Sequence, residues 1–192
     1  VSAGAAWLGG GLVVVALLLV PRFSRGERAR RPPSEVDEAI CTGCWQCFHD
    51  CPYDAIRMVE RTDGRADHVA RVSPDLCVSC GICAGSCAPM GVGPTGRTGR
   101  DQLEEVRDFL ASADRVPGEI VAIACAHGAL AAGDGLGRAG AVVYPVDCVG
   151  NLHTSVIELA LRGGAGGVLV LSCPPRDCRN REGPKWTGER IY

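Results

Sequence analysis

The chain has 192 residues, twelve of them cysteine, and a formal net charge of −2. A chain of this length can hold two small domains and an extra segment, but not one large enzyme core. The nearly neutral charge gives no indication of a nucleic-acid partner.

The first segment, residues 1–21, carries no charge, and residues 1–20 are apolar or small throughout. As a helix it would reach about 30 Å, the thickness of a bilayer's hydrocarbon core. The alternatives are a buried helix or a signal peptide, but a signal peptide carries its positive charge before the apolar run. Here the arginines follow it, and such flanks stay in the cytoplasm. We therefore expect residues 1–21 to be a transmembrane helix in the cell inner (cytoplasmic) membrane, with the soluble domains facing the cytoplasm.

Residues 22–36 are predicted to be a basic cytoplasmic linker, in which Pro32 and Pro33 disfavour a continuous helix. A cysteine-rich unit follows over residues 37–92. It contains an internal repeat, CTGCWQCFHDCP from Cys41 and CVSCGICAGSCAP from Cys77. Between the two copies, AIRMVE and HVARV flank a TDGR turn, which predicts a β-hairpin.

The repeat has the spacing of iron–sulfur ligands. Each C-x2-C-x2-C loop delivers three thiolates, and in two-cluster proteins the fourth cysteine of each run binds the other run's cluster. Two zinc knuckles are the alternative, but zinc sites pair two C-x2-C arms and do not use a third cysteine per run. We predict one [4Fe–4S] cluster on Cys41, Cys44, Cys47 and Cys87, and another on Cys77, Cys80, Cys83 and Cys51.

This region resembles bacterial-type two-cluster [4Fe–4S] ferredoxins, which implies a small α+β ferredoxin-like domain. One departure from that pattern is that Pro52 follows Cys51 directly, whereas Ala88 separates Cys87 from Pro89. We expect this shift to change the loop near Cys87 without removing a ligand.

Several other side chains lie close to the cysteine runs in the sequence. Trp45, Phe48 and Tyr53 are expected beside the first cluster, either as packing of a small core or as a shield against water. His49 is expected at the surface, because all eight ligand positions are already filled.

Residues 93–117 are predicted to connect two domains. Residues 91–100 are rich in glycine, which indicates a flexible segment. Residues 101–113 place Leu103, Val106 and Phe109 at helical spacing. We expect a bridging helix there, packed against one of the domains.

Residues 118–192 have the pattern of a small α/β domain with a parallel sheet. Three short apolar runs, at residues 120–125, 141–148 and 167–173, are typical of buried parallel strands. A helix is predicted before the third strand, with Asn151 as its N-cap and Gly163 at its end. The tail after residue 173 has no clear period.

The last four cysteines are expected to meet at one sheet edge. Three of them end predicted strands, and the carboxyl ends of parallel strands lie at the ligand-binding edge. Buried structural cysteines and an all-cysteine zinc site are the alternatives. We predict a [2Fe–2S] cluster on Cys125, Cys148, Cys173 and Cys178.

The stretches IACAHGALAAGD and YPVDCVGNLHTSVIELALRGGAGGVLVLSCPPRDCRNREG resemble the delta subunit of methyl-viologen-reducing hydrogenase, the hydrogenase iron–sulfur subunit family. The resemblance implies an electron-transfer module with a [2Fe–2S] cluster, working between a hydrogenase or dehydrogenase and a flavoprotein of the heterodisulfide-reductase type. The chain departs from the family at Gly128, where a second cysteine is common, and at Arg179, where a histidine is common.

Two histidines and three arginines are predicted near this edge. His127 and His153 are expected to have solvent or capping roles, and a hydrogen bond to sulfur is the alternative. The arginines are either a solvated loop or a patch that steers an acidic partner; they are Arg176, Arg179 and Arg181.

Together these features predict a membrane-anchored electron-transfer subunit with no catalytic residue of its own. Its expected partners are the lipid bilayer, a cytochrome b-like or quinone-binding integral membrane subunit, and a cytoplasmic redox protein or flavoprotein. The alternative is a tethered subunit of a hydrogenase or heterodisulfide-reductase-type flavoprotein complex. An enzyme with a substrate at the C-terminal cluster and a structural zinc module are the remaining hypotheses.

Overall fold

The computed structural model describes residues 31–112, 117–129, 135–174 and 176–191. The predicted transmembrane helix over residues 1–21 and most of the basic linker lie outside this range, so the anchor stays a prediction. Among the helices of the described ranges, none is long and apolar enough to cross a membrane.

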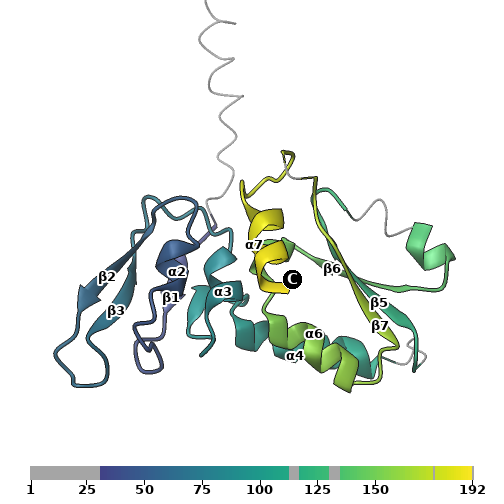
Figure 1. Ribbon diagram of the computed structural model, residues 1–192, viewed down its shortest axis with the longest axis horizontal. Helices are drawn as coiled ribbons and strands as arrows, with labels where there is room; N and C mark the ends of the chain where they lie inside the picture. Colours follow the sequence, from purple (N-terminus) through teal and green to yellow (C-terminus); the bar gives the residue numbers. More distant parts are fainter. Residues whose placement is uncertain (1–30, 113–116, 130–134, 175, 192) are drawn as a thin grey trace, which may run out of the picture. The chain divides into compact units, whose positions relative to one another are not determined.

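The cysteine-rich half consists of two strand pairs and two short helices (Figure 1). Each cysteine run contains a short helix between its second and fourth cysteines, α2 (Gln46–His49) or α3 (Ile82–Ser86). The predicted hairpin is confirmed, because β2 (Ile56–Glu60) pairs antiparallel with β3 (His68–Val72). The core of this half is small, and cysteines make up half of its buried cluster, which contains Cys47, Ile56, Ala70, Cys83, Cys87 and Val92.

A second strand pair closes the cysteine-rich half. Strand β1 (Ser34–Val36) pairs antiparallel with β4 (Val92–Pro94), and the Asp37 amide donates to the Gly91 carbonyl at 2.7 Å. The last three residues of the predicted linker therefore form strand β1, and the start of the predicted flexible segment forms strand β4. That part of the sequence interpretation was wrong because three-residue strands carry too few residues to show a period.

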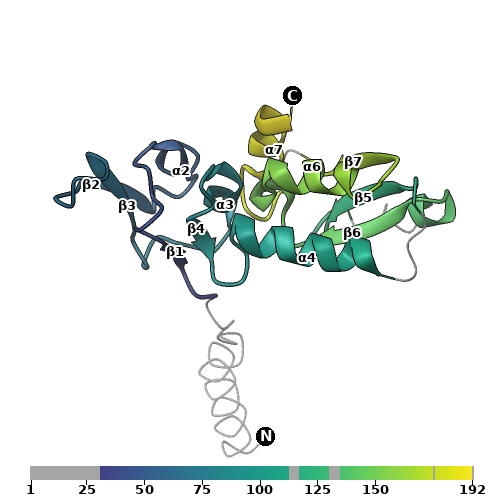
Figure 2. The same ribbon diagram turned by 90° about the horizontal axis from the view of Figure 1, so that it is seen from below.

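Helix α4 (Gly99–Ala111) confirms the predicted bridging helix. It begins with a capping box, in which the Thr98 hydroxyl accepts from the Asp101 amide and the Asp101 carboxylate accepts from the Thr98 amide at 2.7 Å. Helix α4 packs against α6 (Thr154–Arg162) and buries Val106 against the sheet (Figures 1 and 2). It therefore belongs to the packing of the α/β half.

Thr98→Ala is expected to lower the free energy of unfolding by about 1 kcal/mol, because the first turn of α4 loses its cap. Urea unfolding of the full chain measures this change. Thr95→Ala is the matched control, since Thr95 is exposed in the same loop. Equal losses for the two variants would show that the capping box contributes nothing.

The α/β half contains a three-stranded parallel sheet in the order β6-β5-β7. The strands are β5 (Ile120–Cys125), β6 (Val142–Val146) and β7 (Gly167–Leu171), so the three predicted strands are confirmed. Val121 and Ile123 of β5 form the second core with Val106 of α4 and Val156 of α6, and side chains of β6 and β7 pack against it.

Two local predictions in this half need correction. Helix α6 is capped by His153, whose Nδ1 accepts from the Ser155 amide at 3.2 Å, and Asn151 lies instead in a 3-10 turn, η1 (Val149–Asn151). Gly163 ends α6 as predicted. The tail, for which no element was predicted, forms helix α7 (Gly183–Ile191). Its sequence, GPKWTGERI, has two glycines and few apolar residues, so its helicity depends on packing against η1.

Candidate metal centres

The structure brings the first eight cysteines together in two separate pockets. Each pocket combines three cysteines of one run with the last cysteine of the other. We call the first pocket the first site; its thiols are Cys41, Cys44, Cys47 and Cys87. The second pocket is the second site; its thiols are Cys51, Cys77, Cys80 and Cys83. These are the two crossed groups expected from the sequence.

The two cysteine loops have the same backbone geometry. In each loop a residue with positive φ precedes the second cysteine, Gly43 at 67° and Ser79 at 58°. Another follows that cysteine and caps the next helix, Trp45 at 66° and Gly81 at 77°. These left-handed residues coil each loop tightly enough for its three sulfurs to face one pocket.

Backbone amides point at several of the sulfurs. The Gly91 amide donates to Cys87 Sγ at 3.2 Å. Cys87 lines the first site although Ala88 separates it from Pro89. The Ala55 amide donates to Cys51 Sγ at 3.3 Å. The Ser34 amide donates to Cys77 Sγ at the same distance, a contact that the sequence did not reveal. Such N–H···S bonds stabilise charge on cluster sulfurs and help to set the reduction potential.

The electrostatics of both pockets suit a cationic occupant. Burial, together with the neighbouring thiols of Cys87, Cys44 and Cys41, raises the pKa of Cys47 to about 12. Burial also raises the pKa of Cys80 to about 11. Four thiols in one largely apolar pocket ionise together only when positive charge accompanies them, and bound iron would supply that charge.

The aromatic residues divide between the two sites. Trp45 lines the first site, and the Phe48 ring packs edge-on against the Trp45 ring, with the ring centroids 5.4 Å apart. Tyr53 lines the second site, so its predicted place beside the first cluster was wrong. Because Cys51 belongs to the second site, the residues that follow it go there too. His49 is exposed, as predicted.

The last four cysteines converge at the carboxyl edge of the sheet, and we call them the third site. Cys125 Sγ and Cys173 Sγ are 3.3 Å apart. A Cβ at Gly183 would lie 2.9 Å from Cys148 Sγ and 3.1 Å from Cys178 Sγ, so both sulfurs face this glycine. Burial raises the pKa of Cys173 to about 12, and the other three thiols add to that rise.

Gly128 lies directly against the third site. A Cβ at this position would be 2.7 Å from Cys173 Sγ. The position at which the hydrogenase subunits commonly have a further cysteine is therefore part of the site.

Across the described parts of the chain, no three histidine, cysteine or carboxylate side chains are grouped closely enough for a single metal ion.

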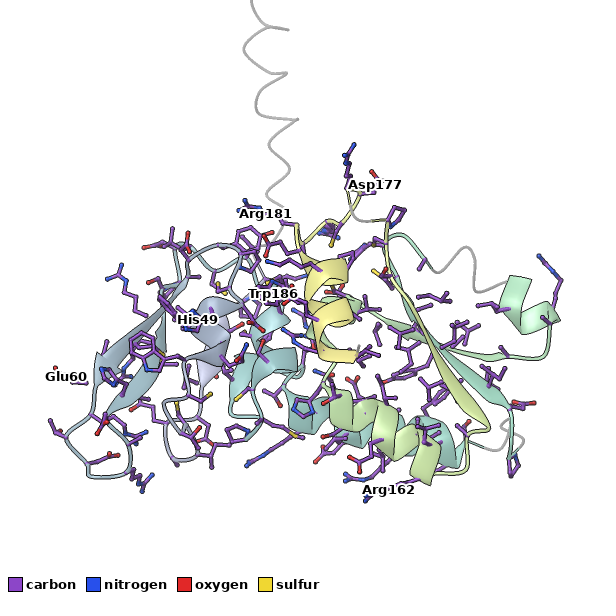
Figure 3. The ribbon with its side chains drawn as sticks, in the orientation of Figure 1. His49, Glu60, Arg162, Asp177, Arg181 and Trp186 are labelled. Atoms are coloured by element: carbon purple, nitrogen blue, oxygen red, sulfur yellow. The ribbon has the colours of Figure 1, made fainter. Side chains whose placement is uncertain are left out.

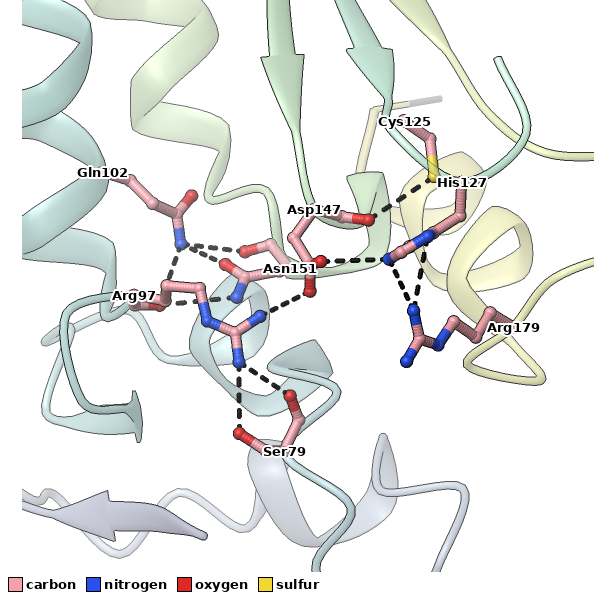
Figure 4. Close-up of polar contacts among 8 residues, drawn as sticks. All are labelled: Ser79, Arg97, Gln102, Cys125, His127, Asp147, Asn151 and Arg179. Atoms are coloured by element: carbon pink, nitrogen blue, oxygen red, sulfur yellow. Dashed lines mark hydrogen bonds and ion pairs between the residues drawn. The ribbon is translucent and has the colours of Figure 1, made fainter. Parts of the chain in front are cut away.

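The two histidines have structural contacts. His127 Nε2 is 3.1 Å from Asp147 Oδ1 and 3.2 Å from Arg179 Nη1 (Figure 4). Buried His153 caps α6, and burial lowers its pKa while a hydrogen bond with the Cys87 backbone opposes that shift. The capping role predicted for His153 is thus confirmed.

The predicted arginine patch is divided among several contacts. Arg181 lies beside the start of α7 (Figure 3), donates to the Pro52 carbonyl at 2.8 Å and covers the Tyr53 ring at 5.4 Å. Arg179 contacts His127, and Arg176 is exposed. Arg181 therefore connects the third-site loop to the second site.

A buried ion pair joins α7 to the cysteine-rich half. Arg190 Nη2 lies 2.9 Å from Asp50 Oδ2, and Asp50 is only 1% exposed. The Ser86 hydroxyl donates to the same carboxylate at 2.6 Å. Asp50 and Ser86 directly precede Cys51 and Cys87, the two cysteines that cross between runs. Helix α7 thus contacts the residues directly before Cys51 and Cys87, the two cysteines that join the other run's site.

Two crossed cysteine pockets and a third cysteine group at a sheet edge define an iron–sulfur electron-transfer protein. Comparison with known proteins agrees: residues 40–91 match the 4Fe-4S dicluster domain family, and residues 120–192 match the family of the methyl-viologen-reducing hydrogenase, delta subunit. The chain therefore contains both domains, which confirms the two resemblances and relates it to hydrogenase and heterodisulfide-reductase-type complexes.

One curated relative is an iron-sulfur subunit of the CoB--CoM heterodisulfide reductase of Methanopyrus kandleri, 52% identical over 44 residues. The matched segment covers 22% of this chain and 7% of that protein. No solved structure matches the chain.

Proposed function

We propose that this chain is an electron-transfer subunit with two [4Fe–4S] clusters and one [2Fe–2S] cluster. The first and second sites would each hold a [4Fe–4S] cluster. The third site would hold the [2Fe–2S] cluster on Cys125, Cys148, Cys173 and Cys178. When bound, such clusters accept and release single electrons.

The observation that carries the proposal is the crossed grouping of the first eight cysteines. Cys51 and Cys87 each join the other run's pocket, as two-cluster ferredoxin ligands do. The protein contributes the thiolates, the amide donors to sulfur and a buried surrounding that keeps water away. Four thiols are a donor set both for [2Fe–2S] and for zinc, and iron analysis distinguishes the two. As placed in the described parts of the chain, the thiols are not grouped closely enough for a single metal ion.

For the partners we propose a membrane complex. The chain would relay single electrons between a quinone-binding or cytochrome-type membrane component and a cytoplasmic redox partner, with residues 1–21 as its anchor in the inner membrane. The second candidate is a tethered subunit of a hydrogenase or heterodisulfide-reductase-type flavoprotein complex. The delta-subunit match over residues 120–192 and the name of the Methanopyrus relative favour this second candidate.

Cysteine replacement with iron analysis tests the clusters. Anaerobically purified full-length protein is expected to hold about ten iron atoms per chain, and Cys173→Ser is expected to lose about two of them together with the [2Fe–2S] EPR signal. Ser172→Ala is the matched control, because Ser172 is the exposed neighbour of Cys173. Full iron in Cys173→Ser, or zinc in place of iron, would refute the proposed third cluster.

Fractionation of the source cells tests the partners. The proposal expects the chain in the membrane fraction, purified together with an integral redox subunit. A chain that purifies instead with a flavoprotein supports the second candidate. Finding it in the soluble fraction without a redox partner contradicts both.

A further inference from the structure

One arginine side chain bridges the second and third sites. Arg97 Nη2 donates to the Ser79 carbonyl at 2.9 Å and to the Ser79 hydroxyl at 3.1 Å (Figure 4). Arg97 Nη1 pairs with Asp147 Oδ2 at 2.6 Å. Ser79 lies between Cys77 and Cys80, and Asp147 directly precedes Cys148. A single guanidinium therefore contacts a ligand loop of each site.

The backbone of Arg97 is held in place by contacts with residues of the α/β half. Gln102 Nε2 donates to the Arg97 carbonyl at 3.4 Å and to the Asn151 carbonyl at 3.0 Å. Asn151 packs against Gly81, where a Cβ would come within 2.8 Å of Asn151 Cγ. Gly81 directly follows Cys80, and Asn151 lies in the turn just after Cys148. The close approach needs a glycine at 81, and it fixes Arg97 between the two ligand loops.

A second arginine makes a parallel connection. Arg181, three residues after Cys178, contacts Pro52 and Tyr53, the residues that follow Cys51. Tyr53 lines the second site, so the Arg181 guanidinium over its ring joins the loop after Cys178 to that site. Both arginines connect the third site to the second site.

The position of Arg97 also makes its charge effective. The side chains of Arg97 and Asp147 are 25% and 23% exposed, so water only partly screens them. An iron–sulfur cluster gains one negative charge on reduction. The Arg97 cation balances the Asp147 carboxylate beside Cys148, so its removal leaves an uncompensated negative charge near the clusters, and its presence raises both potentials.

We propose that Arg97 is a positioning residue that pairs the second and third sites for electron exchange and raises the reduction potential of both. The inference rests on the proposed function and adds the order of the relay, with the first site at its outer end. The step is a one-electron transfer, in which the donor site is oxidised by one electron and the acceptor site is reduced by one. No bond is made or broken, and no proton moves.

Arg97→Gln in the full chain tests the proposal by EPR-monitored redox titration, with signals assigned from Cys44→Ser, Cys80→Ser and Cys173→Ser. The potentials of the second and third sites are expected to fall together, while that of the first site stays unchanged. Arg97→Lys keeps the charge, so its potentials are expected to stay close to those of the unaltered protein. Arg100→Gln is the matched control, since Arg100 is exposed three residues further on. Unchanged potentials in Arg97→Gln, or a shift at the first site alone, would overturn the proposal.

A measurement on the unaltered protein keeps the test valid if Arg97→Gln fails to fold. The EPR signal of the third site is expected to broaden and relax faster at the potential where the second site becomes reduced, because the two paramagnets are neighbours. Broadening that follows reduction of the first site instead would overturn the proposed order. A protein that holds no iron at the third site would refute the proposed function itself, and iron analysis identifies that case separately.

Discussion

Arg190→Leu is expected to lower the free energy of unfolding by about 3–5 kcal/mol, because Asp50 would remain buried without its charge partner. Asp50 is 1% exposed, and the Arg190 guanidinium lies 2.9 Å from its carboxylate. Arg190 also donates to the Gly150 carbonyl at 2.8 Å and the Ile82 carbonyl at 3.1 Å, so its loss leaves further acceptors unpaired. Chemical denaturation followed by circular dichroism measures the change.

Two further variants identify the origin of that loss. Lys185→Leu removes an exposed partner of Glu182, which lies 3.5 Å away and directly before the first residue of α7, and is expected to cost less than about 1 kcal/mol. Adding Asp50→Leu to Arg190→Leu is expected to recover part of the stability, since no uncompensated charge then remains. If Arg190→Leu lowered the free energy of unfolding as little as Lys185→Leu does, the ion pair would not be what holds α7 in place.

Cys83→Ser is expected to remove the cluster of the second site, with a loss of about four iron atoms per chain. The effect should extend to folding. Cysteines make up half of the buried cluster in this half of the protein, so bound clusters supply the cross-links that a small apolar core does not. Iron analysis and thermal unfolding of the same samples measure the two effects together.

Ile82→Val is the control for Cys83→Ser. Ile82 is fully buried beside Cys83, and its shortening is expected to cost about 0.5–1.5 kcal/mol while all the iron is retained. Comparable iron losses in the two variants would mean that packing, and not sulfur ligation, determines cluster content. Loss of the first site's signal in Cys83→Ser while the second site's signal is retained would contradict the crossed grouping.

The connection between the halves suggests why an electron-transfer chain would join these two domains. The Arg190–Asp50 pair holds the segments before Cys51 and Cys87, and Arg97 and Arg181 link the second site to the third. Fixed spacing between redox centres favours fast transfer. In the proposed relay, the aromatic surroundings of the first site, with Cys44 exposed beside Trp45, would form the outer end that faces a partner.

The errors of the sequence interpretation share one origin. Tyr53 follows the first cysteine run in the sequence but lines the second site, because Cys51 crosses over. Strands β1 and β4 are three residues long, too short for any periodicity to show. Helix α7 lacks an apolar stripe, and its packing against η1 compensates for that. In each case contacts between distant segments outweigh local preference.

The sequence by itself determined the grouping of the first eight cysteines, the hairpin, the bridging helix and the three parallel strands. Those features follow from local patterns: ligand spacing, a turn between two short apolar segments, short apolar runs and apolar residues at helical spacing. Only the tertiary structure decided that Ser34, Arg97, Asn151 and Arg190 belong to the sites, and that the second site lies next to the third. A cation or an amide far away in the chain leaves no spacing pattern, because its role depends on where the fold brings it.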